Sequence, residues 1–248
     1  MPDDNSERRQ PVFNLPDVVI LLIAVLVGIH FVREYVLSRE FDLWALFTFA
    51  FIPARITEPA QVAGGFPGGG GAAIWSFLTY SLLHADWGHV SINCLWLAAF
   101  GSPLARRFGA LRFLLFSIAG AVGGAVMHLA FHPDEIVPLV GASAAISAHM
   151  AGSIRFILAS GGPLRSGSNP EAYHRPAQPL SAILRDNRVI LFVAVWFGLN
   201  FVFGVMGAGS GLASGPIAWQ AHVGGFITGL LLFPFFDPVA VATPIDRA

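Results

Sequence analysis

The chain has 248 residues, of which 55% are apolar and only 12% are charged, and its formal net charge is −1. Soluble domains carry about 25% charged residues, so this composition predicts an integral membrane protein. The absence of a net positive charge argues against a nucleic-acid-binding surface. The single cysteine, Cys94, excludes a disulfide within the chain.

A membrane-spanning helix needs about 20 mostly apolar residues. Six stretches come near this length, and the second is the most polar of them: 15–32, 89–104, 111–131, 137–160, 189–206 and 216–236. They predict an all-α polytopic bundle of six transmembrane helices. The expected organisation is a polar segment 1–14, one membrane domain 15–236 and a short tail 237–248.

Arginine provides every basic side chain outside the histidines, and its distribution predicts the orientation of the chain. The connections after the third and fifth spans carry none, whereas those after the second and fourth contain Arg106, Arg107, Arg112, Arg165, Arg175, Arg185 and Arg188. Arginine-rich connections stay in the cytoplasm. Both termini are therefore expected there, most simply in a bacterial inner membrane.

The first connection is long and mixed in charge. Its apolar stretch 41–52 is too short to span, so we expect it at the membrane interface. The glycine-rich run 64–71 predicts a flexible loop. The fourth connection is rich in Ser, Gly and Pro and also predicts a loop.

Two polar residues lie at matching depth in separate spans. Ser143 is near the outer end of the fourth span, and His222 is near the outer end of the sixth. At a rise of about 1.5 Å per residue, both lie within about 10 Å of the outer boundary. They form a candidate nucleophile–base pair if the two helices touch.

Small residues predict such a contact, because they let membrane helices approach closely. The sixth span has Ala218, Ala221, Gly225 and Gly229 on one stripe, and the fourth is slender at Gly141, Ala144, Ala145, Ala148 and Gly152. A serine in a membrane helix more often bonds a backbone carbonyl, and a lone intramembrane histidine is structural about as often as functional. The spacing alone leaves both interpretations open.

His89 and Asn93 add a third polar feature in the second span. They are four residues apart, so they share one helix face, and both can donate hydrogen bonds. Two donors beside a nucleophile are what an oxyanion hole requires, and the alternative is polar contact between helices. His84 precedes them on a predicted loop, where we expect a positioning role.

These residues together resemble the motifs of the rhomboid intramembrane serine proteases. The matching parts are His84 with His89-x-x-x-Asn93, then Gly141-Ala142-Ser143, then Ala221-His222-x-x-Gly225-x-x-x-Gly229. They follow one another in the family's order, on the second, fourth and sixth spans, over residues 75–232.

The resemblance implies hydrolysis of peptide bonds in or next to transmembrane segments of other membrane proteins, within the lipid bilayer. Ser143 would be the nucleophile and His222 the base of a dyad. The N–H of Ser143, with His89, Asn93 and the N–H of Ala142, would bind the oxyanion. Gly141 and Gly225 would be positioning residues, and no cofactor is implied.

The chain departs from the family pattern around this core. Ala144 follows the serine where glycine is common, and Ser147 stands where an aromatic residue often supports the histidine. Ser76 and Ala105 replace a common arginine and glutamate. The departures touch scaffolding rather than the dyad.

Two other classes of function stay open. One is a catalytically inactive relative that binds and escorts membrane proteins. The other is a small transporter with a polar intramembrane path, although the repeated halves typical of transporters are not visible. Because His128, His132 and His149 show no persuasive ligand spacing, no metal site is expected.

Overall fold

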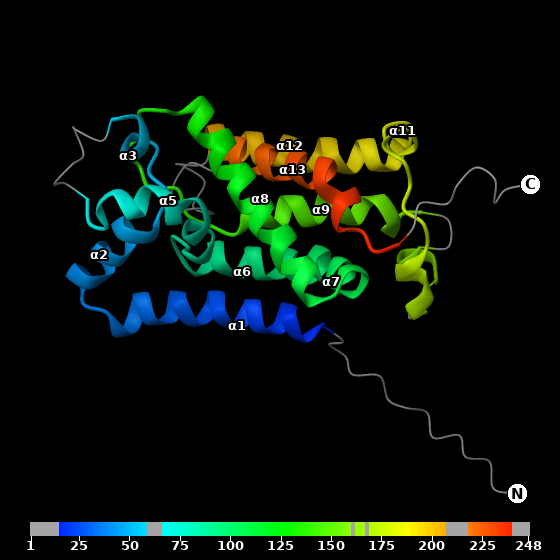
Figure 1. Cartoon of the computed structure of the whole chain (residues 1–248), viewed down its shortest axis with the longest axis horizontal. Helices are drawn as coiled ribbons and strands as arrows, with labels where there is room; N and C mark the ends of the chain where they lie inside the picture. The colour runs from blue at the N-terminus through cyan, green and yellow to red at the C-terminus, as the bar shows by residue number, and fades with distance from the viewer. Residues whose placement is uncertain (1–14, 59–65, 160–161, 167–168, 207–217, 240–248) are drawn as a thin grey trace, which may run out of the picture.

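The computed structural model describes residues 15–58, 66–159, 162–166, 169–206 and 218–239. This part of the chain is an all-α bundle in which most long helices share one direction and α8 crosses them obliquely (Figure 1). Its long segments are α1 (Asp17–Phe31) continued by η1 (Val32–Val36), α6 (Trp87–Trp96) continued by η3 (Leu97–Gly101) and α7 (Ser102–Phe108), α8 (Ala110–Phe131), α9 (Ser143–Ile157), α12 (Asn187–Met206) and α13 (Trp219–Phe236). The predicted fold class is confirmed.

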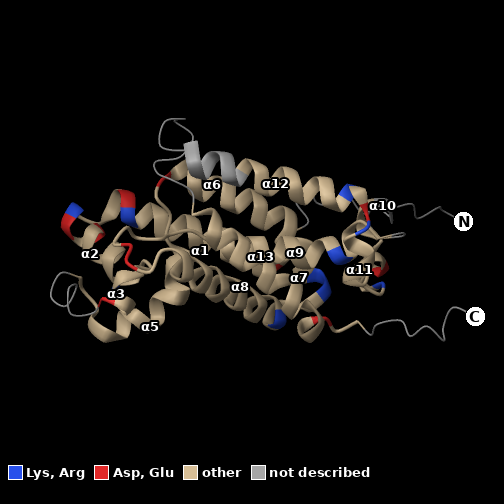
Figure 2. Cartoon of the chain, turned by 90° about the horizontal axis from the view of Figure 1, so that it is seen from above, with Lys and Arg blue, Asp and Glu red and all other residues tan. Residues whose placement is uncertain are grey.

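The described part of the bundle exposes apolar side chains and buries several polar ones within an apolar core. Leu21, Leu111 and Phe235 are 62%, 71% and 82% exposed, whereas Asn93 and His149 are buried. Charged residues gather at the two ends and leave the middle almost free of charge (Figure 2). This distribution suits a lipid environment, in which apolar side chains face hydrocarbon and polar groups bond inside the protein.

Among the residues that the structure describes, three helices are long and apolar enough on their own to cross a membrane: Asp17–Val36, α8 and α13. The central helix α9 has only 15 residues, and every side chain from Ala144 to Phe156 is buried. Because its neighbours surround it, α9 needs little lipid-facing apolar surface. A helix in this position tolerates polar residues, and it therefore does not stand out as a membrane span when hydropathy is the only criterion.

The expected start of the fourth span at residue 137 is wrong. Residues 137–142 form no helix, and Leu139 pairs with Phe51 in an isolated antiparallel bridge with N···O distances of 2.8 and 3.1 Å. Pro138 disfavours helix in the residue before it. The helix therefore begins only at Ser143.

The first connection contains more helix than the sequence predicts. It folds into α2 (Arg39–Phe49), α3 (Ala54–Thr57), α5 (Gly69–Thr79) and η2 (Tyr80–Leu82). The predicted loop 64–71 is therefore wrong from Gly69 onward, and residues 59–65 lie outside the described part. Trp75 explains the helix, because its ring covers Gly71 and its Nε1 donates to the Thr48 carbonyl at 3.0 Å.

Helices α8, α9 and α13 form the centre of the bundle, and glycine sets their separation. A β-carbon added at Gly225 would collide with the carbonyl oxygen of Ala144, and one at Gly229 would lie 2.6 Å from the Ala148 Cα. A β-carbon at Gly124 of α8 would collide with Ala144 as well. The predicted contact of small residues between the fourth and sixth spans is thus present.

The two ends of the bundle carry different structures. The end at which α9 begins, called the Ser143 end, meets the first connection (Figure 1). The opposite end, called the Arg107 end, carries α10 (Pro163–Ser166), η4 (Pro170–His174) and α11 (Leu180–Ile183). The fourth connection, predicted as a loop, therefore contains short helices.

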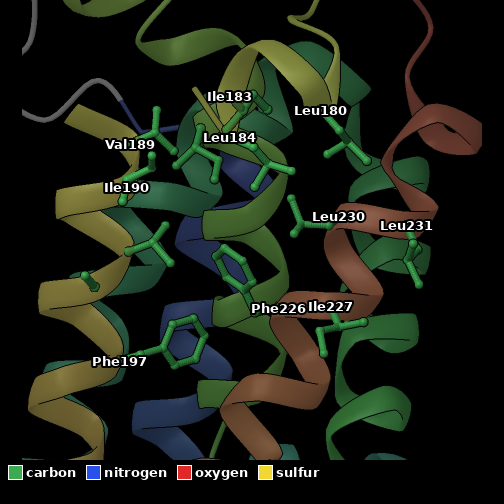
Figure 3. A pocket seen from close by; sticks show the side chains of 13 residues that line it. Leu180, Ile183, Leu184, Val189, Ile190, Phe197, Phe226, Ile227, Leu230 and Leu231 are labelled. Atoms are coloured by element: carbon green, nitrogen blue, oxygen red, sulfur yellow. The ribbon is translucent and has the colours of Figure 1, made fainter. Parts of the chain in front are cut away.

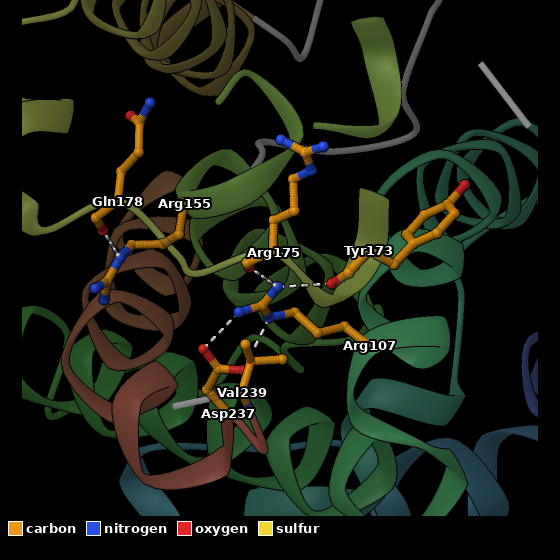
Figure 4. Close-up of polar contacts among 7 residues, drawn as sticks. All are labelled: Arg107, Arg155, Tyr173, Arg175, Gln178, Asp237 and Val239. Atoms are coloured by element: carbon orange, nitrogen blue, oxygen red, sulfur yellow. Dashed lines mark hydrogen bonds and ion pairs between the residues drawn. The ribbon is translucent and has the colours of Figure 1, made fainter. Parts of the chain in front are cut away.

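Arg107 joins three segments at its end of the bundle (Figure 4). Its guanidinium forms two 2.8 Å hydrogen bonds with the Asp237 carboxylate and donates to the backbone carbonyls of Tyr173 and Arg175 at 2.6 and 2.8 Å. The Arg155 Nε similarly donates to the Gln178 carbonyl at 2.8 Å. The Arg107 bonds hold the fourth connection and the end of α13 against α7, and the Arg155 bond holds the fourth connection against α9.

An apolar groove of about 430 Å³ lies between α9, α11, α12 and α13 (Figure 3). Side chains such as Leu184, Phe197 and Phe226 line it. None of the candidate site residues predicted from the sequence lines this groove.

The glycine packing yields the first prediction. Gly225→Ala should destabilise the protein by about 1–3 kcal/mol, because the added methyl group forces α13 away from the α9 backbone. Gly28→Ala is the control, since a β-carbon at Gly28 would meet no atom within 4 Å. Thermal unfolding in detergent measures both. Equal melting temperatures for the two variants would contradict the role assigned to Gly225.

Candidate active site

Ser143 and His222 meet at the junction of α9 and α13. Ser143 is the first residue of α9, and His222 lies in the first turn of α13. The distance from Ser143 Oγ to His222 Nε2 is 2.7 Å, which is a short hydrogen bond. His222 is buried and Ser143 is half-buried, so the pair lies below the surface at the Ser143 end of the bundle.

The backbone before Ser143 makes a sharp entry into the helix. Gly141 has φ +122°, a conformation that residues with a β-carbon rarely adopt, and its N–H donates to the Tyr80 carbonyl at 3.0 Å. The Ile146 N–H then donates to the Ala142 carbonyl at 3.0 Å. The earlier N–H groups of α9 have no partner one turn back, so the helix presents a partial positive charge beside Ser143.

His89 lies directly against this turn. A β-carbon added at Gly141 would be 2.8 Å from His89 Nε2 and 3.7 Å from Ser143 Oγ. The imidazole of His89 and the hydroxyl of Ser143 therefore border the same small space. Glycine suits position 141 for two reasons: it adopts φ +122° without strain, and it has no β-carbon to collide with His89.

The start of α6 fixes the backbone of His89. Its N–H donates to Asp86 Oδ1 at 2.7 Å, which makes Asp86 the N-cap of α6. The Ala85 N–H approaches His89 Nδ1 at 3.4 Å. If Nδ1 accepts this bond, the ring proton is on Nε2, the atom that faces Gly141.

Asn93 is buried one turn further along α6. Its Nδ2 donates to the His89 carbonyl at 2.9 Å, within the same helix. An amide nitrogen carries two N–H bonds, so one remains for another acceptor. The observed bond alone equally suits a structural role.

His84 supports the turn from behind. It is fully buried, and the Ala142 N–H approaches its Nε2 at 3.5 Å. The Ala142 N–H, which the family resemblance implied as an oxyanion donor, is thus directed at His84. Arg33 of η1 in turn donates to the His84 carbonyl at 2.9 Å and to Asp42 at 2.7 Å.

Sequence reasoning missed four residues that hold this site: Arg33, Asp42, Tyr80 and Asp86. Asp86 carried a recognisable signal, because an aspartate just before a helix is a common N-cap. Tyr80 is fully buried and donates to the Ala121 carbonyl at 2.8 Å, a contact with α8 that no local pattern indicates.

Ser147 occupies a closed position. It is completely buried, and its Oγ has no hydrogen-bond partner among the described residues. His222 is nevertheless held close to α9, because the Gly225 face of α13 lies on the Ala144 carbonyl. The contact of α13 with the α9 backbone therefore keeps His222 near Ser143, with a serine at position 147.

Comparisons with known proteins show the family of this chain. The Rhomboid domain family model matches residues 71–236, which is well over half of the chain. Rhomboid-related protein 2 of Mus musculus is 29% identical over 176 residues, covering 68% of this chain and 52% of that protein. Rhomboid protease GluP of Bacillus subtilis (strain 168) is 26% identical over 170 residues, covering 68% of this chain and 26% of that protein.

A third relative, Rhomboid-related protein 3 of Homo sapiens, is 36% identical over 84 residues, covering 32% of this chain and 20% of that protein. The chain thus spans about half or less of the length of these relatives. One of the three names states a protease activity, and the other two state none. The domain match across the bundle shows that the chain belongs to the rhomboid family.

Proposed function

We propose that this protein is an intramembrane serine protease that cleaves peptide bonds in or next to transmembrane segments of membrane proteins. The observation that carries the proposal is the 2.7 Å distance between Ser143 Oγ and His222 Nε2 at the amino end of α9. A serine hydroxyl within hydrogen-bond reach of an imidazole is the arrangement that activates a nucleophile.

In the first half of the reaction, Ser143 Oγ attacks the carbonyl carbon of the scissile peptide, and His222 Nε2 takes the hydroxyl proton. The C–N bond then breaks, and the imidazolium of His222 gives its proton to the leaving amine. An ester between Ser143 and the substrate remains. In the second half, His222 takes a proton from water as the water attacks the ester. The bond between the acyl carbon and Ser143 Oγ then breaks, His222 returns a proton to Ser143 Oγ, and the new carboxyl terminus is released.

The negative charge that develops on the substrate oxygen needs hydrogen-bond donors. The Ser143 N–H at the start of α9 is one such donor, and His89 Nε2, which faces Gly141, is a second in the tautomer whose Nδ1 accepts from the Ala85 N–H. Asn93 adds a donor if its second amide N–H turns toward the space beside Gly141. Ala142 is the weakest member of this proposed set, because its N–H is directed at His84.

The bundle also bears on the choice of substrate. A helical transmembrane segment buries its peptide bonds in its own hydrogen bonds, so it has to unwind before Ser143 can reach a carbonyl. Segments with glycine or proline near the cleavage site unwind at lower cost. We therefore expect cleavage close to such residues at the Ser143 end.

The second candidate is an inactive rhomboid relative that binds membrane proteins without cleaving them. The departures from the family pattern at Ser76, Ala105 and Ser147 favour it, because these positions belong to the family's scaffold around the site. Labelling of Ser143 by a serine-reactive probe separates the two candidates.

Ser143→Ala and His222→Ala should each abolish cleavage of a model transmembrane substrate in liposomes, and Ser143→Ala should abolish labelling by a fluorophosphonate. Ser117→Ala is a matched control, because Ser117 Oγ also lies 2.7 Å from a histidine nitrogen, that of His149. We expect this control to keep its labelling and cleavage. Substantial cleavage by pure Ser143→Ala protein would refute the proposed nucleophile.

Asn93→Ala should lower kcat by about 10²–10³, with little change in KM, if Asn93 binds the oxyanion in the transition state. Ser91→Ala is the control on the exposed face of the same helix. The kinetic constants and the melting temperature are measured on one preparation. A lower melting temperature with normal turnover of the folded protein would instead assign Asn93 a structural role.

We also propose that both termini lie in the cytoplasm, with the Arg107 end of the bundle on that side, and that the host membrane is a bacterial inner membrane. The arginines of α7 and the fourth connection support this orientation (Figure 2). A reporter fused after Ala248 should then be active in the cytoplasm, and a tag inserted between Glu58 and Phe66 should be accessible from outside. The opposite pattern would reverse the proposed topology.

A further inference from the structure

Three metal-ligating side chains meet where α8 ends, at the Ser143 end of the bundle. His128 lies in the last turn of α8, His132 follows its last residue, and Glu135 lies in the next turn. His128 Nε2 is 3.2 Å from Glu135 Oε2, and His132 Nδ1 is 3.9 Å from the same oxygen. One ligand atom from each residue lies within 4.8 Å of the other two.

The local backbone preforms this cluster. Residues i and i+4 share a helix face, which places His132 beside His128, and their ring centroids are 5.0 Å apart. The helix then stops at Phe131, and the Glu135 N–H donates back to the His132 carbonyl at 3.3 Å. This turn brings the Glu135 side chain back over the two histidines.

Contacts with the first connection hold the turn in place. The Ala54 N–H donates to the Glu135 carbonyl at 3.1 Å, and Thr57 Oγ1 donates to the Pro133 carbonyl at 2.7 Å. The ligand-bearing turn is thus tied to α3 as well as to α8. These bonds leave the Glu135 carboxylate available to the histidines.

The chemistry of the set matches zinc. Two imidazole nitrogens and one carboxylate oxygen are a ligand set that zinc takes in proteins, with a fourth position left for water. Bonds of about 2.0–2.1 Å in tetrahedral geometry place ligand atoms about 3.3–3.5 Å apart. The His128–Glu135 distance of 3.2 Å is close to this spacing, and the partly exposed His132, at 3.9 Å, has to move by less than 1 Å toward the same oxygen.

The position on the helix also favours a bound cation. The cluster lies at the carboxyl end of a 22-residue helix, where the helix dipole attracts positive charge. His128 is 5% exposed, and its Nε2 faces the Glu135 carboxylate inside the protein.

We propose that His128, His132 and Glu135 bind a divalent transition-metal ion, zinc by ligand type, which joins the end of α8 to the turn that follows it. This departs from the expectation of no metal site, which rested on sequence spacing alone. The proposal is independent of the proposed protease function, because none of the three residues belongs to the candidate active site.

A metal ion at this position would restrict the motion of the backbone segment that leads to the candidate active site. Residues 136–140 lead from Glu135 to Gly141, and Leu139 is already bridged to Phe51. A metal bound to Glu135 would fix the start of this path to α8. The predicted consequence is a more stable Ser143 end when the metal is bound, since a ligand that binds only the folded protein raises its stability.

The test uses the full chain, purified in detergent without a histidine tag and stripped with a chelator. Cobalt(II) is the probe, because a tetrahedral site with nitrogen and oxygen ligands gives it visible absorption bands, and zinc should displace it. We expect one cobalt ion per chain. Zinc should also raise the melting temperature in a concentration-dependent manner.

Glu135→Gln and His132→Asn are the informative variants, since both positions are partly exposed and both replacements keep the approximate shape. Each should weaken cobalt binding by at least about tenfold, the loss that follows even from removing a group that only orients a ligand. His174→Gln, at the Arg107 end, is the matched control and should bind as the unaltered chain does. Melting temperatures without metal check that each variant is folded.

Two results would overturn the proposal. One is the absence of cobalt bands and of a zinc-dependent rise in melting temperature for the unaltered protein. The other is cobalt binding of unchanged strength in both Glu135→Gln and His132→Asn. That result would assign the ion to other histidines, such as those near Ser143. Neither result would bear on cleavage by Ser143, which is measured separately.

Discussion

The close approach of α9 and α13 is the constraint on which the rest of the site depends. Gly225 lies on the Ala144 carbonyl and Gly229 lies on Ala148, so the two helix backbones are in contact. Lipid tails are as apolar as the helix surfaces, and association in a membrane therefore relies on such packing more than on the hydrophobic effect. The contact places His222 beside Ser143 and keeps it there without an aromatic side chain at position 147.

Much of the fold could be predicted from the sequence, because hydropathy and small-residue spacing are local signals. Ser143 and His222 stood out since each lies near the same end of its apolar stretch, beside small residues. His84 stood out by its place just before His89, and the family pattern contributed the positioning role of Gly141. The structure places these four residues together, while the roles proposed for them rest on the kinetic tests.

The missed features depend on long-range contacts or on backbone geometry. The helix that begins at Gly69 requires Trp75 to cover Gly71, whereas a glycine run read alone predicts a loop. Arg33 reaches His84 across 51 positions of sequence. The convergence of Glu135 on two histidines depends on a turn after the helix end, which the spacing His-x-x-x-His does not encode.

A second serine–histidine pair shows why distance alone does not make a nucleophile. Ser117 Oγ lies 2.7 Å from His149 Nε2, the same distance as in the Ser143–His222 pair. The Ser117 hydroxyl, however, donates to the Phe113 carbonyl at 2.7 Å, so its proton is directed away from the imidazole.

The surroundings of the two pairs differ as well. The ring of His149 stacks on Phe113 with a centroid distance of 4.7 Å, and His149 is buried in the centre of the bundle. Ser143 instead begins a helix, whose first N–H groups have no partner one turn back, and His89 lies against the preceding turn. What distinguishes the candidate site is therefore its position at a helix start, where N–H groups are available for the donor role proposed above.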